Sequence, residues 1–114
     1  MENHDEQRLA SNFVVGNGIK ARPANVIAAT INTNPYMVYF GQELGEQGMD
    51  CEGYSGSDGP TTIFDYWTID TIKRWRNEGK YNEEKLTDSE KELRKFYCRL
   101  LEICNKEKAI TNGS

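Results

Sequence analysis

Tyr36-Met37-Val38-Tyr39-Phe40 is an uninterrupted apolar and aromatic run, and it stands between Pro35 and Gly41. A strand with one face in water alternates polar and apolar residues, whereas a run without polar positions is typical of a strand buried on both faces. Such a strand needs neighbours on both sides, because its backbone N–H and C=O groups must be paired away from water. We therefore expect this run to be a buried strand of a parallel α/β sheet.

Helical patterns occur on both sides of this run. Upstream, Pro23 suits a first helical turn, and apolar residues at helical spacing predict a helix from about Ile19 to Ile31. Downstream, a short helix is expected from Thr68 to Trp75, and Thr87 with Glu90 fits a capping box that opens a longer helix. The longer helix carries an apolar stripe at helical spacing, formed by Leu93, Phe96, Tyr97, Leu100, Leu101 and Cys104.

The order of these elements is helix, buried strand, long loop and helix. That order is one and a half βα units of an α/β protein. The loop from Gly41 to Asp65 is glycine-rich and polar, and loops longer than about 12–15 residues are usually functional or disordered. No partner strand is identifiable in the remaining residues, so we expect the neighbours of the buried run to come from polypeptide elsewhere.

Size and charge restrict the class of protein. A chain of 114 residues fits one small domain, which we place over residues 1–114. Lys and Arg number 14 against 18 Asp and Glu, a formal net charge of -4, which is the wrong sign for a phosphate-binding surface. No apolar run approaches the roughly 20 residues of a membrane helix. We therefore expect neither nucleic acid as a partner nor a membrane span.

Glu2-Asn3-His4-Asp5-Glu6-Gln7-Arg8 concentrates three carboxylates, the single histidine and an arginine within seven positions. A charged terminus of this kind is ordinarily solvated and without a specific role. The stretch nevertheless resembles the motif of the α-amylase superfamily, glycoside hydrolase family 13, in which an Asn-His-Asp triplet follows the seventh strand of the catalytic barrel.

Three further stretches carry the same resemblance. Tyr39-Phe40-Gly41-Gln42-Glu43 is similar to the eighth-strand motif of this superfamily, which has an aromatic pair, a glycine, a variable residue and a glutamate. The stretches 53–59 and 61–67 resemble the loop after that strand in bacterial α-amylase-like enzymes. The resemblance therefore implies a partial TIM barrel: the end of strand 7, helix 7, strand 8, a long loop and helix 8, with residues 1–114 as a C-terminal fragment.

The resemblance also implies roles for individual residues. Asp5 would be the carboxylate that hydrogen-bonds the distorted sugar and stabilises the transition state, and His4 and Asn3 would bind the same sugar. Arg8 and Glu43 are further candidates for sugar binding. For Glu43 an alternative stays open, in which it is the structural partner of an arginine such as Arg8. Tyr39 and Phe40 are expected in the core rather than as a sugar platform.

The implied activity is hydrolysis of α-1,4-glucosidic bonds in starch or maltodextrin by a retaining mechanism. Retaining enzymes need a nucleophile and a general acid on two carboxyl groups, and in this superfamily both follow strands four and five, which are not in this chain. We therefore expect the chain alone to be inactive. The resemblance implies a bacterial enzyme acting in the periplasm, at the cell surface or outside the cell.

Cofactors and partners follow from the same comparison. The stretch 50–59 lacks the alternate acids and terminal glutamate of a calcium loop, so we expect no metal site in this chain, although the intact enzyme can hold calcium. The expected partners are an α-glucan or maltooligosaccharide, together with the rest of the barrel or a second copy. The alternative function is a stand-alone, noncatalytic module that binds glucans or another protein.

Overall fold

The fold is built along one long helix, α3, which runs from Asp88 to Lys106. The computed structural model describes residues 2–4, 6–48 and 69–112 of the chain. Helix α3 begins with the predicted capping box: Glu90 N donates to Thr87 Oγ1 at 3.2 Å, and Thr87 N donates to Glu90 Oε2 at 2.8 Å. These two bonds satisfy backbone donors that a helix start leaves without partners, so the predicted start of this helix is confirmed.

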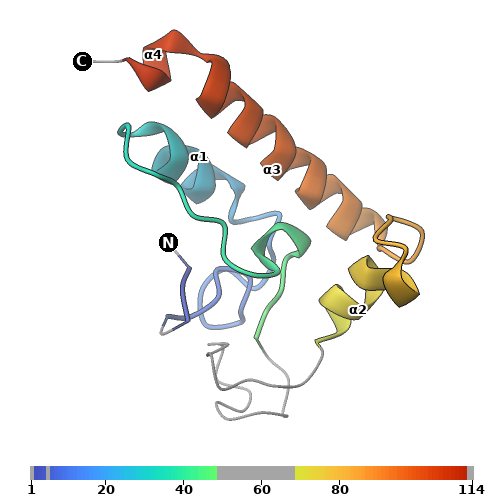
Figure 1. Ribbon diagram of the computed structural model, residues 1–114. Helices are drawn as coiled ribbons and strands as arrows, with labels where there is room; N and C mark the ends of the chain where they lie inside the picture. The colour runs from blue at the N-terminus through green and yellow to red at the C-terminus, as the bar shows by residue number, and fades with distance from the viewer. Residues whose placement is uncertain (1, 5, 49–68, 113–114) are drawn as a thin grey trace.

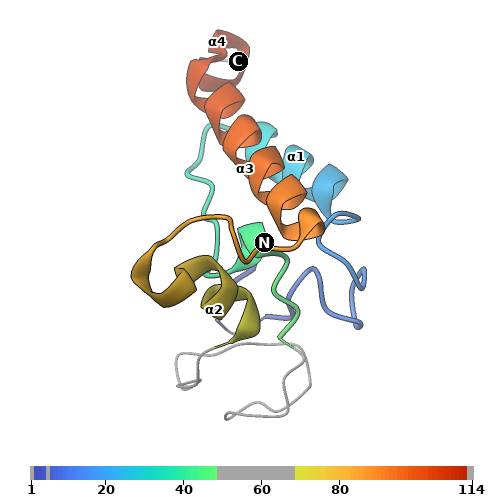
Figure 2. The same cartoon turned by 90° about the vertical axis from the view of Figure 1, so that its right-hand side faces the viewer.

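Helix α1 (Arg22–Thr30) lies beside α3, and the two views of Figures 1 and 2 agree on this arrangement. Pro23 stands in its first turn, as predicted. Not all of its apolar residues face the core. Asn25 and Ala29 are buried, whereas Ile27 is 60% and Ile31 71% exposed. Asn25 is turned inward because Tyr36 and Gln42 donate hydrogen bonds to its side-chain oxygen. The spacing of apolar residues gives no information about such polar partners.

Four short helical elements complete the described chain. The 3-10 turn η1 (Gln42–Leu44) packs against α3, and the C-terminal helix α4 (Lys108–Thr111) follows α3 directly. Helix α2 (Asp70–Arg76) continues into the 3-10 turn η2 (Asn77–Gly79) at the end of the molecule where α3 begins (Figure 1). The predicted short helix is therefore confirmed as α2.

The apolar core lies where α1, η1 and the inner face of α3 meet. Its central member is Leu93, which is 2% exposed. A Cβ added to Gly18 would lie 2.6 Å from Leu93 Cδ2 and 3.0 Å from the Cα of Gly45, so a glycine is needed for the two loops to approach this closely. The buried apolar residues are Ala10, Ala21, Ala29, Leu44, Ile69, Leu86, Leu93, Tyr97 and Leu100.

The expected partial TIM barrel is contradicted, because the described residues contain helices and turns but no β-strand. The run 36–40 has no regular secondary structure, and Met37 is 57% and Phe40 61% exposed. Its backbone bonds locally instead: Tyr39 N donates to Gln42 Oε1 at 2.9 Å, and Gln42 N donates to the Tyr39 carbonyl at 2.9 Å. The described ranges contain no strand that could pair with this run, so these local turn bonds take the place of the inter-strand hydrogen bonds of a sheet.

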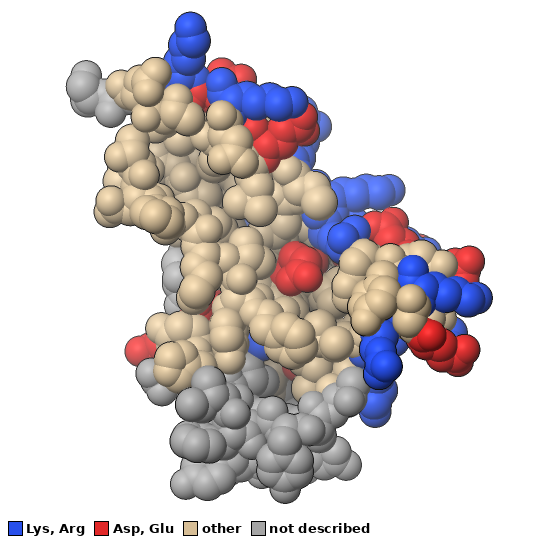
Figure 3. Space-filling model, in the orientation of Figure 1, with Lys and Arg blue, Asp and Glu red and all other residues tan. Residues whose placement is uncertain are grey.

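The charged side chains are unevenly distributed over the surface. In Figure 3 they gather along α3 and around α2, whereas the side formed by α1 and the chain that follows it shows mostly uncharged atoms. Four apolar side chains of α1 and the chain that follows it are exposed, namely Val26, Ile27, Ile31 and Met37. Within the described ranges, no helix combines the length and apolar character needed to cross a membrane.

Candidate functional site

The N-terminal stretch is anchored by a buried ion pair between Glu2 and Arg8. Arg8 is 0% and Glu2 2% exposed, and Arg8 Nη1 lies 2.9 Å from Glu2 Oε2. The second oxygen of this carboxylate, Oε1, accepts from Leu9 N at 2.8 Å. Both ends of the segment are thereby fixed. Next to this pair, Asn3 is half-buried and His4 is exposed, so both lie toward the surface beside a fixed ion pair.

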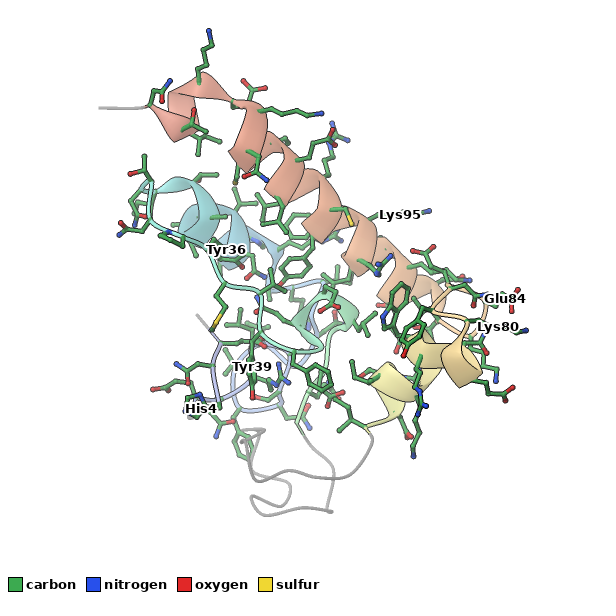
Figure 4. The ribbon with its side chains drawn as sticks, viewed as in Figure 1. His4, Tyr36, Tyr39, Lys80, Glu84 and Lys95 are labelled. Carbon is green, nitrogen blue, oxygen red and sulfur yellow. The ribbon has the colours of Figure 1, made fainter. Side chains whose placement is uncertain are left out.

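Arg8 also joins two of the stretches that carry the resemblance. Its Nη2 donates to the carbonyl of Phe40 at 2.5 Å, and its guanidinium carbon lies 4.4 Å from the centre of the Tyr39 ring. Both contacts span more than 30 positions of sequence. Figure 4 shows Tyr39 and His4 on the same side of the molecule. The structure therefore brings Arg8 and its partner Glu2 together with Tyr39 and Phe40, which the sequence separates from them by a helix.

Gln42 holds the second of these stretches in place. It is 3% exposed, and its Nε2 donates to Tyr97 Oη at 2.9 Å and to Asn25 Oδ1 at 3.2 Å. Tyr36 Oη donates to the same Asn25 oxygen at 2.8 Å. Burial raises the pKa of both tyrosines, and the bond from Gln42 offsets part of that rise. The network therefore consists of neutral groups that tie α1, η1 and α3 together.

Sequence reasoning did not identify Asn25 or Tyr97 as members of a polar network. Tyr97 was expected in the apolar stripe, where it does lie, and its hydroxyl was not assigned a partner. The available signal was the single asparagine within the apolar pattern of residues 24–31. A buried amide at such a position requires hydrogen-bond partners, but the sequence does not say which.

Glu43 follows Gln42 and lies at the edge of a hollow of about 520 Å³. Its carboxylate has no ion-pair or hydrogen-bond partner within the described ranges, and Arg8 instead pairs with Glu2. Gly41, with φ 79°, forms the left-handed turn that places η1 here. The hollow is lined by Val38, Tyr39, Phe40, Gly41, Glu43, Ile72, Trp75, Arg76 and Tyr81.

A second hollow, of about 540 Å³, lies between η1 and the first turns of α2 and α3. Its charged groups already have partners. Arg74 binds Glu90 with Nη2 and Oε1 at 2.5 Å, while Glu46 accepts from the Thr71 hydroxyl and from Gly48 N. Because these groups satisfy one another, the hollow beside Glu43 is the stronger candidate for a ligand.

The predicted site residues thus have different positions. Arg8 is buried against protein groups, His4 is exposed, and Asn3 and Glu43 are half-exposed. Asp5, the predicted transition-state stabiliser, lies outside the described residues, as does the stretch 50–59 considered for calcium. Among the residues that are described, no group of three or more His, Cys, Asp or Glu side chains is arranged to hold a metal ion.

Comparison with known proteins yielded no relative. No family model matches the chain, and neither a curated protein nor a solved structure matches it.

Proposed function

We propose that this chain is part of a glycoside hydrolase that acts on α-1,4-glucosidic bonds of starch or maltodextrin by a retaining mechanism. One observation supports the proposal above the others. Arg8 contacts Glu2, Tyr39 and the Phe40 carbonyl, so two stretches that resemble the α-amylase superfamily independently of each other are in contact. A solvated, charged terminus would not bury its arginine completely.

In this proposal Asp5, His4 and Asn3 bind one sugar unit, and Asp5 favours its distorted form. Hydrogen bonds of this kind accelerate hydrolysis only if they are stronger in the transition state than in the ground state. That requires a rigid base. The Glu2–Arg8 pair supplies it next to Asn3 and His4, because both side chains are buried and each makes a second contact. Arg8 is then a positioning residue.

The bond-breaking step needs two further carboxyl groups, about 5–5.5 Å apart, as nucleophile and as acid and base. The resemblance assigns neither to residues of this chain. They belong to the remaining polypeptide of the enzyme, and we expect the purified chain to bind glucans without hydrolysing them. Ile27, Ile31 and Met37 are exposed large apolar side chains, and association with further polypeptide would remove this apolar surface from water.

A second candidate is a stand-alone, noncatalytic module that binds glucans or another protein. The described part of the chain favours it in one respect: no buried side-chain nitrogen or oxygen there lacks a hydrogen-bond partner. A segment removed from its surroundings would be expected to leave some of these groups unpaired.

The two candidates are separated by calorimetric titration of the purified chain with maltoheptaose, and with cellohexaose as the β-linked control. The variants are Asp5→Asn and His4→Ala, with Lys95→Ala on the outer face of α3 as an exposed control (Figure 4). Hydrolysis of p-nitrophenyl-maltoside is measured alongside.

The glycosidase proposal predicts binding that is selective for maltoheptaose, weakened in Asp5→Asn and His4→Ala, unchanged in Lys95→Ala, and not accompanied by hydrolysis. Selective binding that is independent of Asp5 and His4 favours the noncatalytic module. Hydrolysis abolished by Asp5→Asn would show that the chain contains its own nucleophile and acid, against our expectation. A folded chain that binds neither saccharide contradicts both glucan-binding proposals.

A further inference from the structure

The hollow beside Glu43 combines aromatic rings with a few polar groups. Its volume of about 520 Å³ falls in the range of ligand pockets, which are typically about 300–1,000 Å³ and mostly apolar with a small number of orienting polar groups. Four aromatic residues line it: Tyr39, Phe40, Trp75 and Tyr81. They come from two separate segments, the turn before η1 and the stretch from α2 to just beyond η2, so the fold and not the local sequence creates the hollow.

Two of these rings are exposed to an extent that packing does not explain. Phe40 is 61% and Tyr81 60% exposed, although aromatic side chains are usually among the most buried in area. Trp75 differs, because Arg94 lies over its ring at 3.9 Å from the centre and covers one face. Phe40 and Tyr81 therefore expose ring surface at the border of the hollow, while one face of the Trp75 ring is covered by Arg94.

Tyr81 is held in this position by a strained turn. Its φ is 51°, in the left-handed region, as are those of Asn77 and Glu78. A non-glycine residue keeps such a conformation only where its surroundings hold it there. It is fixed by Tyr81 N donating to the Arg76 carbonyl at 3.1 Å and by the buried Asn77, whose Nδ2 donates to Asn82 Oδ1 at 2.7 Å. The turn presents the ring outward instead of allowing it to fold into the core.

The polar groups of the hollow indicate the charge of its ligand. One carboxylate, Glu43, and one guanidinium, Arg76, line it, and neither has an ion-pair partner in the described ranges. Opposite charges in equal number favour a neutral ligand, since an anion would be repelled by one group and a cation by the other. A ligand that hydrogen-bonds to both must carry donors and acceptors.

A flat, neutral ligand with apolar faces and a rim of hydroxyl groups meets these conditions, and a pyranose sugar ring is such a ligand. We propose that Phe40 and Tyr81 stack a glucose unit of an α-glucan in this hollow, with Glu43 accepting and Arg76 donating hydrogen bonds to its hydroxyls. Tyr39 connects this subsite to the N-terminal stretch, because it lines the hollow and also contacts Arg8. The inference rests on the proposed function, and it adds Arg76 of α2 and Tyr81, which follows η2, to the binding surface.

The test is titration of the purified chain with maltoheptaose, comparing Phe40→Ala and Tyr81→Asn with the wild type. Asparagine tolerates the left-handed conformation, so Tyr81→Asn removes the ring without adding backbone strain. Phe13→Ala is the matched control, because Phe13 is an equally exposed aromatic at 63% that does not line the hollow. Tyr81→Phe keeps the ring and removes only the hydroxyl.

Loss of one stacked ring, worth about 0.5–1.5 kcal/mol beyond area burial, corresponds to affinity weakened by up to about tenfold in Phe40→Ala and in Tyr81→Asn. Phe13→Ala and Tyr81→Phe are expected to stay within about twofold of the wild type. Wild-type affinity in Tyr81→Asn, or equal loss in Phe13→Ala, overturns this inference and leaves the proposed function intact. If the wild type itself binds no α-glucan, the proposed function fails first.

Discussion

Replacing Arg8 by methionine tests whether the buried ion pair holds the N-terminal stretch. The change leaves the Glu2 carboxylate at 2% exposure without its cation and removes the donor to the Phe40 carbonyl. Removing one partner of a buried pair costs about 3–5 kcal/mol, because the remaining charge is uncompensated. Domains are typically stable by about 5–15 kcal/mol, so Arg8→Met is expected to lose a large fraction of its free energy of unfolding.

The double variant Glu2→Gln/Arg8→Met separates the stranded charge from other effects. A glutamine at position 2 retains an oxygen that can accept from Leu9 N, as Glu2 Oε1 does at 2.8 Å, but it has no charge to bury. We expect the double variant to recover about 1–3 kcal/mol relative to Arg8→Met alone, the size of interaction energy found between residues in direct contact.

The assay is urea unfolding followed by circular dichroism at the helix band, for the wild type, both single variants and the double variant. Lys85→Met serves as control, because Lys85 and its partner Glu78 are 51% and 81% exposed, and surface pairs contribute at most about 1 kcal/mol. The reasoning is refuted if Arg8→Met destabilises no more than Lys85→Met, or if the effects of Glu2→Gln and Arg8→Met simply add.

Three further predictions follow from the core, the cap of α3 and the polar network. Gly18→Ala should lower the free energy of unfolding by about 1–3 kcal/mol, measured by urea unfolding, because its Cβ would lie 2.6 Å from a methyl carbon of Leu93. Burial raises the pKa of Glu90, but hydrogen bonds from Arg74 and Thr87 outweigh it and leave the pKa below its ordinary value of 4.5. The ionised carboxylate therefore stabilises the fold above that value, and this stabilisation is lost as pH falls. Thermal melts between about pH 6 and about pH 3 should show that acid lowers the stability of the wild type more than that of Glu90→Gln. Burial raises the pKa of Tyr97 above its ordinary value of 10.0. The neutral hydroxyl therefore contributes to the stability of the fold below about pH 10, and this contribution is lost as pH rises beyond that value. Thermal melts at alkaline pH should show a steeper loss of stability in the wild type than in Tyr97→Phe, and equal slopes would contradict this.

Local interactions explain which elements sequence reasoning located correctly. The capping box of Thr87 and Glu90 involves residues three positions apart, and the stripe of α3 repeats within single helical turns. Both are determined by short-range geometry. Pro23 likewise marks the first turn of α1 by its own backbone angle. These features depend little on what the rest of the chain does, and the structure reproduces them.

Reading the run 36–40 as a strand failed because a strand is not a local structure. Its hydrogen bonds go to another segment, and the described ranges contain none that pairs with it. Side chains bond to its backbone groups instead: Gln42 accepts from Tyr39 N, and Arg8 donates to the Phe40 carbonyl. For the same reason the buried positions of Glu2, Arg8 and Gln42 were not anticipated, since polar residues are assigned to the surface unless their partners are known.

By itself, the sequence determined where α1, α2 and α3 lie, the capping box of α3, the acidic balance of charge and the stretches that resemble a sugar-cleaving family. Tertiary structure decided which face of α1 is buried, which groups Arg8 binds, and how residues 38–43 and 72–81 come to enclose one hollow. The physical reason is the range of the interactions. Helix periodicity and capping act over three or four positions, whereas a buried charge or a ring-lined hollow depends on segments that meet only after the chain has folded.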